Sequence, residues 1–110
     1  MIMSKPFREF TEIDRIVHEP ARLALLTALS VCASADFLYL QRLTGLSKGN
    51  LSSHLAKLEG AELVQIDKQF VGKTPRTNVR LTAVGRMAIE RYWQQLDELR
   101  AASLRLAPDT

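Results

Sequence analysis

Residues 44–59 read TGLSKGNLSSHLAKLE, and this stretch carries most of the information about the fold. At about 100° per residue, Leu51, Leu55 and Leu58 fall within about 40° of one another on a helix. Ser47 is a suitable N-cap for that helix, and Gly60 stands where a left-handed residue commonly ends one. The stretch therefore predicts a helix over about residues 47–59 whose leucine face packs against a core.

The opposite face of this predicted helix is narrow, polar and free of acidic residues. No side chain on it is bulkier than Lys57. A helix that enters the major groove of DNA, about 12 Å wide, needs small polar side chains that can reach base edges. An ordinary solvated surface is the alternative. The candidate DNA-binding residues of the helix are Ser47, Lys48, Gly49, Asn50, Ser52, Ser53, His54 and Lys57.

Several side chains on this face are suited to particular contacts. Asn50 can form two hydrogen bonds with adenine, and Lys48 or Lys57 can bind guanine or phosphate. Ser53 can bond a phosphate or its own helix. Gly49 costs roughly 1 kcal/mol relative to alanine inside a helix. Either the first turn tolerates it, or it lets the helix N-terminus approach a phosphate closely.

Positive charge is concentrated in the middle of the chain. Residues 42–86 hold eight basic and three acidic residues, an excess of five positive charges, whereas the whole chain has a net charge of +3. No acidic residue occurs at positions 37–58 or 68–89. Because acidic groups repel phosphate, this distribution favours a polyanion-binding surface. A solvated basic face is the alternative.

Three helices are expected before this stretch. Residues 12–18 are compatible with a short one. Pro20, which is favourable in a first turn, begins the next, PARLALLTALSVC, whose apolar face holds Leu23, Leu26, Ala28 and Leu29. After a break of small residues at 33–35, Asp36 can cap a helix over FLYLQRL, which Gly45 ends. That helix places Phe37, Leu40 and Leu43 on one side.

After Gly60 the pattern changes to that of a β-hairpin. Residues 63–71 alternate as in a strand, with Val64, Ile66 and Phe70 as packing candidates, and residues 77–82 return as a second strand. Between them, residues 72–76 form a polar tip, in which Pro75 would stiffen the turn. Lys73, Arg76 and Thr77 are the candidate DNA contacts here, since cations on a slim hairpin can enter a narrow minor groove. A solvated turn is the alternative.

Thr82 can cap a long final helix over residues 83–105. Ile89, Tyr92, Leu96 and Leu99 are spaced three, four and three apart, as in a helix-pairing seam, and Trp93 adds bulk beside them. The helix is longer than so small a domain needs to cover its core. We therefore expect these five residues to form a homodimer interface. The alternative is a helix folded back on its own domain.

Length and composition restrict the class of protein. A chain of 110 residues makes one domain, with residues 12–82 as its main body, the final helix attached and residues 108–110 as a tail. No apolar run approaches the roughly 20 residues of a membrane span, and the first ten residues lack a signal-peptide core, so a cytoplasmic protein is expected. Cys32 is interpreted as a small buried hydrophobe, with an intersubunit disulfide as the alternative.

Catalytic and metal-binding patterns are absent from the sequence. It contains no nucleophile elbow, phosphate-cradling glycine loop or acidic metal cluster, so we expect no enzyme and no cofactor. His18 and His54 are the only histidines and lack the spacing of metal ligands. For His54, bracing the helix or contacting phosphate is the favoured interpretation.

The run from Phe37 to Arg86 resembles the small MarR-like winged-helix regulators of bacteria and archaea, within the ArsR/MarR superfamily. It is most similar to a compact group with a leucine-serine-x-histidine-leucine recognition helix and a proline-arginine-threonine wing. The matching residues are Leu51, Ser52, His54 and Leu55 in the helix, Pro75, Arg76 and Thr77 in the wing, Leu81, Thr82, Gly85 and Arg86 at the strand-to-helix junction, and residues 18–22 at the first core helix.

The resemblance implies a mainly α fold with a small β-hairpin, a winged helix-turn-helix with a long C-terminal dimerisation helix. It also implies a homodimer that binds a roughly palindromic double-stranded DNA site and represses or activates transcription. A winged helix that holds a protein partner is the alternative. The helix FLYLQRL lacks the cysteine metal motif of ArsR relatives. The chain is shorter than the larger MarR proteins, which leaves a small-molecule effector unknown.

Overall fold

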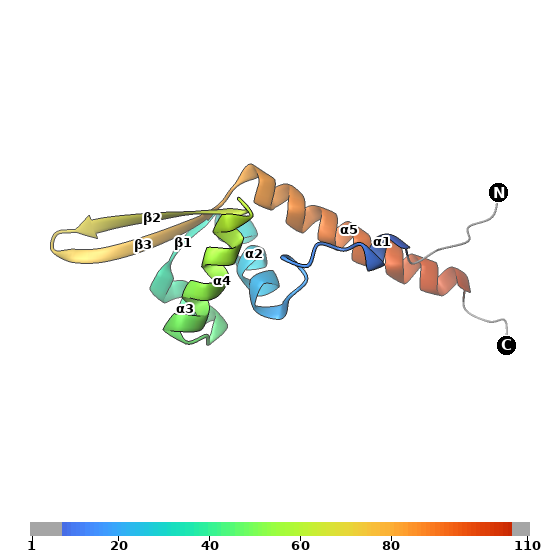
Figure 1. Ribbon diagram of the computed structural model, residues 1–110, viewed down its shortest axis with the longest axis horizontal. Helices are drawn as coiled ribbons and strands as arrows, with labels where there is room; N and C mark the ends of the chain where they lie inside the picture. Colours follow the sequence, from blue (N-terminus) through green and yellow to red (C-terminus); the bar gives the residue numbers. More distant parts are fainter. Residues whose placement is uncertain (1–7, 107–110) are drawn as a thin grey trace.

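The computed structural model describes residues 8–106 (Figure 1). Its elements are α1 (Arg8–Thr11), α2 (Pro20–Cys32), β1 (Ser34–Asp36), α3 (Phe37–Thr44), α4 (Lys48–Gly60), β2 (Val64–Val71), β3 (Thr74–Leu81) and α5 (Ala83–Leu106). Helices α2, α3 and α4 gather below the base of the hairpin, and α5 runs away from it in the opposite direction (Figure 1). The expected winged helix-turn-helix with a long C-terminal helix is confirmed. The predicted tail at residues 108–110 lies outside the described residues.

The helix caps expected from the sequence are present. Pro20 occupies the first turn of α2, behind the N-cap Glu19. Asp36 Oδ1 accepts a hydrogen bond from the backbone N–H of Tyr39 at 2.7 Å and so caps α3. Gly45 ends that helix with φ of 73°, a left-handed conformation that suits glycine. These local signals delimit the helix-turn-helix.

The sheet has three strands in the order β1-β3-β2, all antiparallel. Its hairpin pairs Val64 with Leu81 at the base and Val71 with Thr74 at the tip. The strand β1 is a correction, because its residues were expected to form only a break between helices. Ala35 pairs with Val79 there and is itself buried. A strand of three residues carries too little alternation to be recognised, and only the tertiary pairing with β3 defines it.

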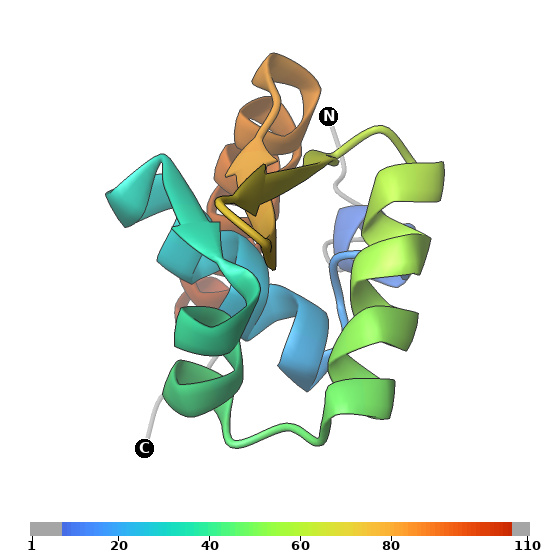
Figure 2. The same cartoon turned by 90° about the vertical axis from the view of Figure 1, so that its left-hand side faces the viewer.

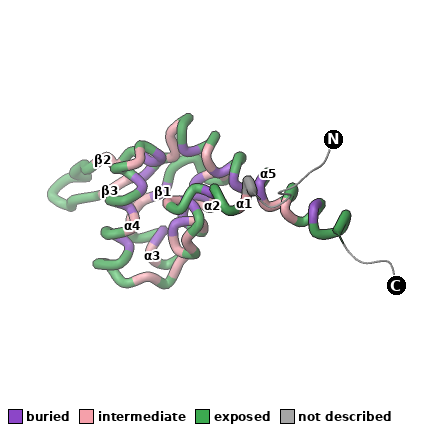
Figure 3. The backbone as a smooth tube through the Cα atoms, turned by 45° about the vertical axis from the view of Figure 1, so that its right-hand side comes forward, coloured by how far each residue is buried: buried purple, intermediate pink, exposed green. Residues whose placement is uncertain are grey.

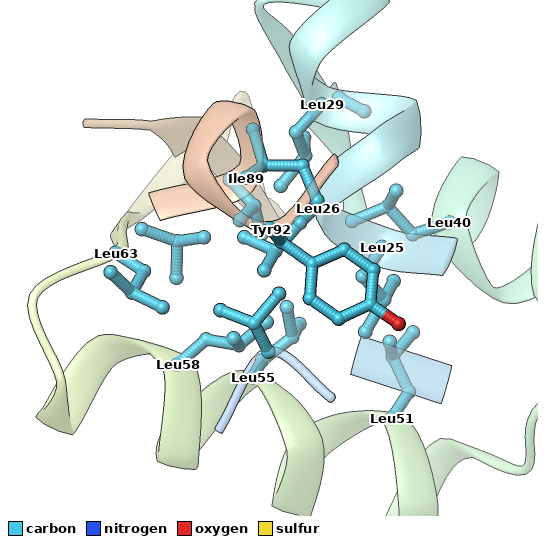
Figure 4. Packing of buried hydrophobic residues seen from close by; sticks show 14 of the residues in the cluster. Leu25, Leu26, Leu29, Leu40, Leu51, Leu55, Leu58, Leu63, Ile89 and Tyr92 are labelled. Atoms are coloured by element: carbon cyan, nitrogen blue, oxygen red, sulfur yellow. The ribbon is translucent and has the colours of Figure 1, made fainter. Parts of the chain in front are cut away.

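One hydrophobic core joins the helices to the base of the sheet (Figure 4). The leucine face of α4 is buried as predicted. Leu25, missed in the sequence, is fully buried beside Leu26 and Leu29 of α2. The labelled residues of Figure 4 come from α2, α3, α4, α5 and the turn before β2, so burial of these leucines sets the position of α4 relative to the wing.

The long helix α5 begins against this core and then leaves it. Thr82 Oγ1 accepts a hydrogen bond from the backbone N–H of Gly85 at 2.9 Å and caps the helix, as predicted. Gly85 lies so close to the backbone carbonyl of Leu63 that a Cβ at this position would overlap it. The distal half of α5 extends beyond the helical body, where α1 lies against it (Figure 1).

Two predicted helix features are wrong. Residues 12–18 are not helical, and the short helix lies earlier, at Arg8–Thr11. Within residues 12–18, the Asp14 carboxylate accepts a hydrogen bond from the backbone N–H of Ile16 at 2.8 Å. This side-chain contact replaces a backbone hydrogen bond of the helical type. Helix α4 reaches Gly60, but the left-handed residue is Glu62, with φ of 64°. The chain therefore reverses two residues later than expected.

The predicted tip of the hairpin is also too long. Gly72 and Lys73 alone form the turn, and Thr74, Pro75 and Arg76 belong to β3. Gly72 has φ of 65°, and Lys73 is not among the residues with positive φ, a pattern typical of a type II′ turn. Pro75 is therefore a strand residue and does not stiffen the turn.

Three apolar residues expected inside lie at the surface. Phe70 is 75% exposed, Leu43 is 52% exposed, and Cys32 is exposed as a free thiol. The outer half of the hairpin is exposed in Figure 3, because none of the helices within residues 8–106 packs on the sheet beyond its base. Strand alternation predicts which residues lie on the same face of the sheet. How much of that face the helices cover depends on the tertiary packing. Among residues 8–106, no helix combines the length and apolarity needed to cross a membrane.

Candidate nucleic-acid interface

Helix α4 lies at one side of the molecule, next to the projecting hairpin (Figure 2). Leu51, Leu55 and Leu58 are at most 2% exposed and hold the helix to the core. The residues between them are presented to solvent. Ser47, Lys48, Gly49, Asn50, Ser52, Ser53 and Lys57 are all exposed, and His54 is half-buried. The helix thus combines a fully buried apolar face with an accessible polar one.

The N-terminus of α4 is capped and sterically open. Ser47 Oγ accepts a hydrogen bond from the backbone N–H of Asn50 at 3.1 Å, as the sequence predicts. At Gly49, an added Cβ would meet no described atom within 4 Å. The protein's own packing therefore does not require glycine here. Both explanations of Gly49 remain open, tolerance in the first turn and room for a phosphate.

A polar cluster braces α4 from behind. His54 Nδ1 lies 3.2 Å from Arg22 Nη1 and 3.4 Å from Glu19 Oε2. His54 Nδ1 thus lies between the guanidinium of Arg22, which can only donate hydrogen bonds, and the carboxylate of Glu19. Arg22 is 8% exposed and also donates to the carbonyl oxygen of Ile16 at 2.7 Å. This arrangement supports the bracing interpretation of His54.

Glu19 completes the brace by capping α2. Its carboxylate accepts hydrogen bonds from the backbone N–H groups of Ala21 and Arg22, each at 3.0 Å. Partial burial raises the pKa of Glu19, but the two backbone hydrogen bonds and the charges of His54 and Arg22 outweigh it, so the pKa lies below its ordinary value. Glu19 is therefore an anion at neutral pH, positioned between α2 and α4. In the sequence, Glu19 and Arg22 stand out only as part of the family-like segment 18–22, and their bracing role was not predicted.

The hairpin supplies a second accessible surface. Lys68, Lys73 and Arg76 are exposed, whereas Thr77 is half-buried. Lys73 lies in the turn itself, and Arg76 pairs with Gln69 in the adjacent strand. Asp67 is the acidic residue of the hairpin, and its Oδ2 lies 3.8 Å from Arg80 Nε. The Asp67–Arg80 ion pair compensates charge near the base of the hairpin, and Lys68, Lys73 and Arg76 lie closer to the tip than this pair.

A groove of about 840 Å³ separates α4 from the hairpin. Lys48 and Ser52 line it from α4, and Lys68 and Arg76 line it from the strands. The groove thus brings together predicted DNA contacts from both elements. Lys48 and Ser52 belong to the helix, and Arg76 and Thr77 belong to the wing. Asp36 and Glu59 also line the groove, so it carries charges of both signs.

The five predicted interface residues of α5 fall into two groups. Ile89 and Tyr92 are 2% and 4% exposed and belong to the chain's own core, so for them the alternative of a helix folded back on its domain holds. Tyr92 Oη also lies 3.0 Å from His18 Nδ1. Trp93 is 42% exposed, and Leu96 and Leu99 are half-buried. One face of α5 therefore packs on the chain's own core at Ile89 and Tyr92 and continues past it at Leu96 and Leu99.

Potential metal ligands are dispersed in the described part of the chain. Within residues 8–106, no three His, Cys, Asp or Glu side chains come together as metal ligands would. The two histidines have separate partners, Tyr92 for His18 and the pair Arg22 and Glu19 for His54.

A leucine-anchored helix with an exposed polar face, next to a projecting basic hairpin, is the arrangement of a winged-helix DNA-binding domain. The sequence model of the family described as "Winged helix DNA-binding domain" matches residues 21–100, and the chain belongs to this family. An uncharacterized protein of Methanocaldococcus jannaschii is 35% identical over 77 residues, which cover 70% of this chain and 80% of that protein.

Solved structures agree with this assignment. The transcriptional regulator homologue from Pyrococcus horikoshii OT3 has a TM-score of 0.79 and 29% identity, covering 88% of this chain and 95% of that one. A mutant MarR from E. coli, solved in complex with operator DNA, has a TM-score of 0.60 at 18% identity, covering 98% of this chain and 66% of that one. The resemblance to MarR-type regulators is thereby confirmed for the fold.

Proposed function

We propose that this protein is a transcriptional regulator that binds double-stranded DNA in a sequence-specific manner as a homodimer. The observation that carries the proposal is the exposed face of α4 formed by Gly49, Asn50, Ser53 and Lys57, which holds no acidic residue, together with the basic tip of the hairpin. Residues 47–59 enter the major groove, and residues 71–78 contact the minor groove or the backbone. The P. horikoshii relative, itself described as a transcriptional regulator homologue, supports this function.

The residues divide into those that position the protein and those that read the sequence. Lys57, Lys73 and Arg76 are exposed cations suited to phosphate, which supplies affinity for any sequence. Asn50 is exposed in the first turn of α4, where its amide can reach a base edge. Substituting a cation therefore weakens binding to all sequences, whereas substituting Asn50 also relaxes base preference.

Dimerisation follows from the part of α5 that the core leaves uncovered. Trp93, Leu96 and Leu99 remain candidates, and Leu104, 67% exposed, extends the apolar character toward the C-terminal end of the helix. A two-fold symmetric dimer would present two α4 helices to a roughly palindromic site. Half-sites would then be separated by about one helical turn of DNA, roughly 10 bp, or a multiple of that.

The test begins with selection of bound sequences from a random duplex library, followed by affinity measurements over a series of salt concentrations. We expect an enriched, roughly palindromic sequence and an affinity that falls with salt. Lys57→Ala and Arg76→Ala should each reduce the salt slope by about two, because each removes one phosphate contact from both subunits of the dimer. Arg105→Ala, in the last turn of α5, is the matched control for loss of an exposed cation.

Two results would contradict the proposal. Binding that ignores salt and is unchanged by Asn50→Ala, Lys57→Ala and Arg76→Ala would exclude DNA recognition by this surface. Absence of any enriched duplex, together with capture of a specific protein partner that Lys57→Ala releases, would favour a protein-interaction module instead.

A further inference from the structure

The tip of the hairpin carries an exposed aromatic side chain that the core does not use. Phe70 is 75% exposed and lies two residues from the turn. In the strand register it is directly opposite Pro75, so the two apolar side chains share one face of the sheet. Large apolar side chains at the end of a projecting hairpin point to a contact outside the chain.

Strand alternation defines the direction of this apolar pair. Ile66 and Lys68 line the groove between α4 and the hairpin, and Phe70 follows them at the same period of two. Phe70 and Pro75 are therefore on the sheet face that is turned toward the recognition helix. Val71, the next residue, is on the opposite face and is also exposed, at 56%.

The surroundings of the pair are basic. Lys68 and Lys73 are two and three residues from Phe70, and Arg76 follows Pro75. No acidic residue occurs between positions 68 and 89. A protein partner would need to match an apolar pair ringed by cations, whereas the minor groove presents a strong negative potential and apolar sugar walls. This charge complementarity favours nucleic acid as the occupant.

The dimensions agree with insertion into the minor groove. The stretch from Lys68 to Val71 extends about 10 Å at roughly 3.3 Å per residue, and a minor groove is about 7.5 Å deep. The turn at its end is only two residues wide, Gly72 and Lys73. The tip is therefore long enough to span the depth of the groove.

We propose that Phe70, backed by Pro75, is an apolar wedge that enters the minor groove, opens a base step and bends the DNA. This rests on the proposed function, since the same domain must first dock on a duplex through α4. Apolar side chains that insert between base steps unstack them and kink the duplex toward the major groove. Such a wedge also reads sequence, because flexible pyrimidine–purine steps open most easily.

The experiment uses the full-length protein and the duplex selected above, with fluorescent dyes at its two ends to report bending. 2-Aminopurine, whose fluorescence rises on unstacking, is placed at successive steps of the predicted minor-groove contact. Phe70→Ala is compared with Val31→Ala, a loss of exposed apolar surface in α2, outside the residues proposed to contact DNA. Phe70→Leu tests whether another apolar wedge suffices.

We expect wild-type and Val31→Ala proteins to bend the duplex and raise the fluorescence at one step. Phe70→Ala should bind roughly tenfold more weakly, with an unchanged salt slope and a straight duplex, because a buried phenyl contact is lost but no phosphate contact is. Phe70→Leu should retain most of the bend. Thermal unfolding of all variants should coincide, since the side chain is outside the core.

The outcomes separate the two proposals. A wild-type protein that binds the duplex with the expected salt slope but neither bends it nor opens a step overturns the wedge and leaves the proposed function intact. Bending by Phe70→Ala equal to wild type also overturns it. A change in the sedimentation of free Phe70→Ala would assign the pair to contact between copies, and failure to bind any duplex would overturn both proposals.

Discussion

Arg22 of α2 and His54 of α4 face each other across the interior of the helix-turn-helix, with Nη1 and Nδ1 3.2 Å apart. This contact is distant in sequence but connects the N-terminus of the first core helix to the middle of the recognition helix. Since Arg22 is also bonded to the carbonyl oxygen of Ile16, it ties the irregular segment before α2 into the same cluster. The orientation of α4 thus depends on a polar contact as well as on its leucines.

Substitution of Arg22 should weaken this support. Arg22→Met keeps much of the apolar bulk but removes every donor, which leaves His54, Glu19 and the Ile16 carbonyl without that partner. We expect a loss of about 1–3 kcal/mol in the free energy of unfolding, measured by urea denaturation. Arg42→Met, at an exposed position of α3, is the control and should change stability by less than about 0.5 kcal/mol. Equal effects of the two would contradict a bracing role.

The lowered pKa of Glu19 predicts a dependence of stability on pH. A carboxylate whose pKa is lower in the folded than in the unfolded protein adds stability above its ordinary value of 4.5. That contribution is lost as the pH falls through the folded-state pKa. Glu19→Gln should therefore lower stability at neutral pH and narrow its difference from wild type below pH 4.5. Denaturation at a series of pH values checks this, and a difference independent of pH would contradict it.

Position 85 has no room for a side chain larger than that of glycine. A Cβ there would overlap the carbonyl of Leu63, which belongs to rigid backbone at the start of the sheet. We expect Gly85→Ala to destabilise the fold by about 1–3 kcal/mol, because either α5 or the turn before β2 must shift. Gly60→Ala is the matched control, since a Cβ there meets nothing within 4 Å. It should be neutral or stabilising by up to about 1 kcal/mol, as measured by thermal unfolding.

The two groups of α5 residues should respond differently to substitution. Ile89→Ala removes a core side chain and should cost about 2–5 kcal/mol of stability. Leu99→Asp introduces a charge into the proposed dimer contact and should halve the mass seen in sedimentation while far-UV circular dichroism stays the same. It should also weaken binding to a two-half-site duplex far more than to a single half-site. A dimer that persists in Leu99→Asp would place the interface elsewhere.

Local signals in the sequence were sufficient for most of the helical part of the fold. Asp36, Gly45, Ser47 and Thr82 act on backbone groups within a few residues, so their capping roles are visible without any tertiary information. The leucine period of α4 predicted its buried face for the same reason. The polar residues opposite the leucines were therefore expected to be exposed, and the candidate DNA contacts of the helix were chosen from them.

Other features depend on partners far away in the chain. The strand β1 exists because β3 pairs with it, and Ile89 and Tyr92 are core residues because the first half of α5 packs against α2. Phe70 was expected inside because alternation reports a shared sheet face, not how far the helices cover that face. The brace of Glu19, Arg22 and His54 joins residues up to 35 positions apart. Periodicity and capping are local free-energy preferences that a sequence displays directly, whereas coverage and long-range pairing arise only when the elements pack together.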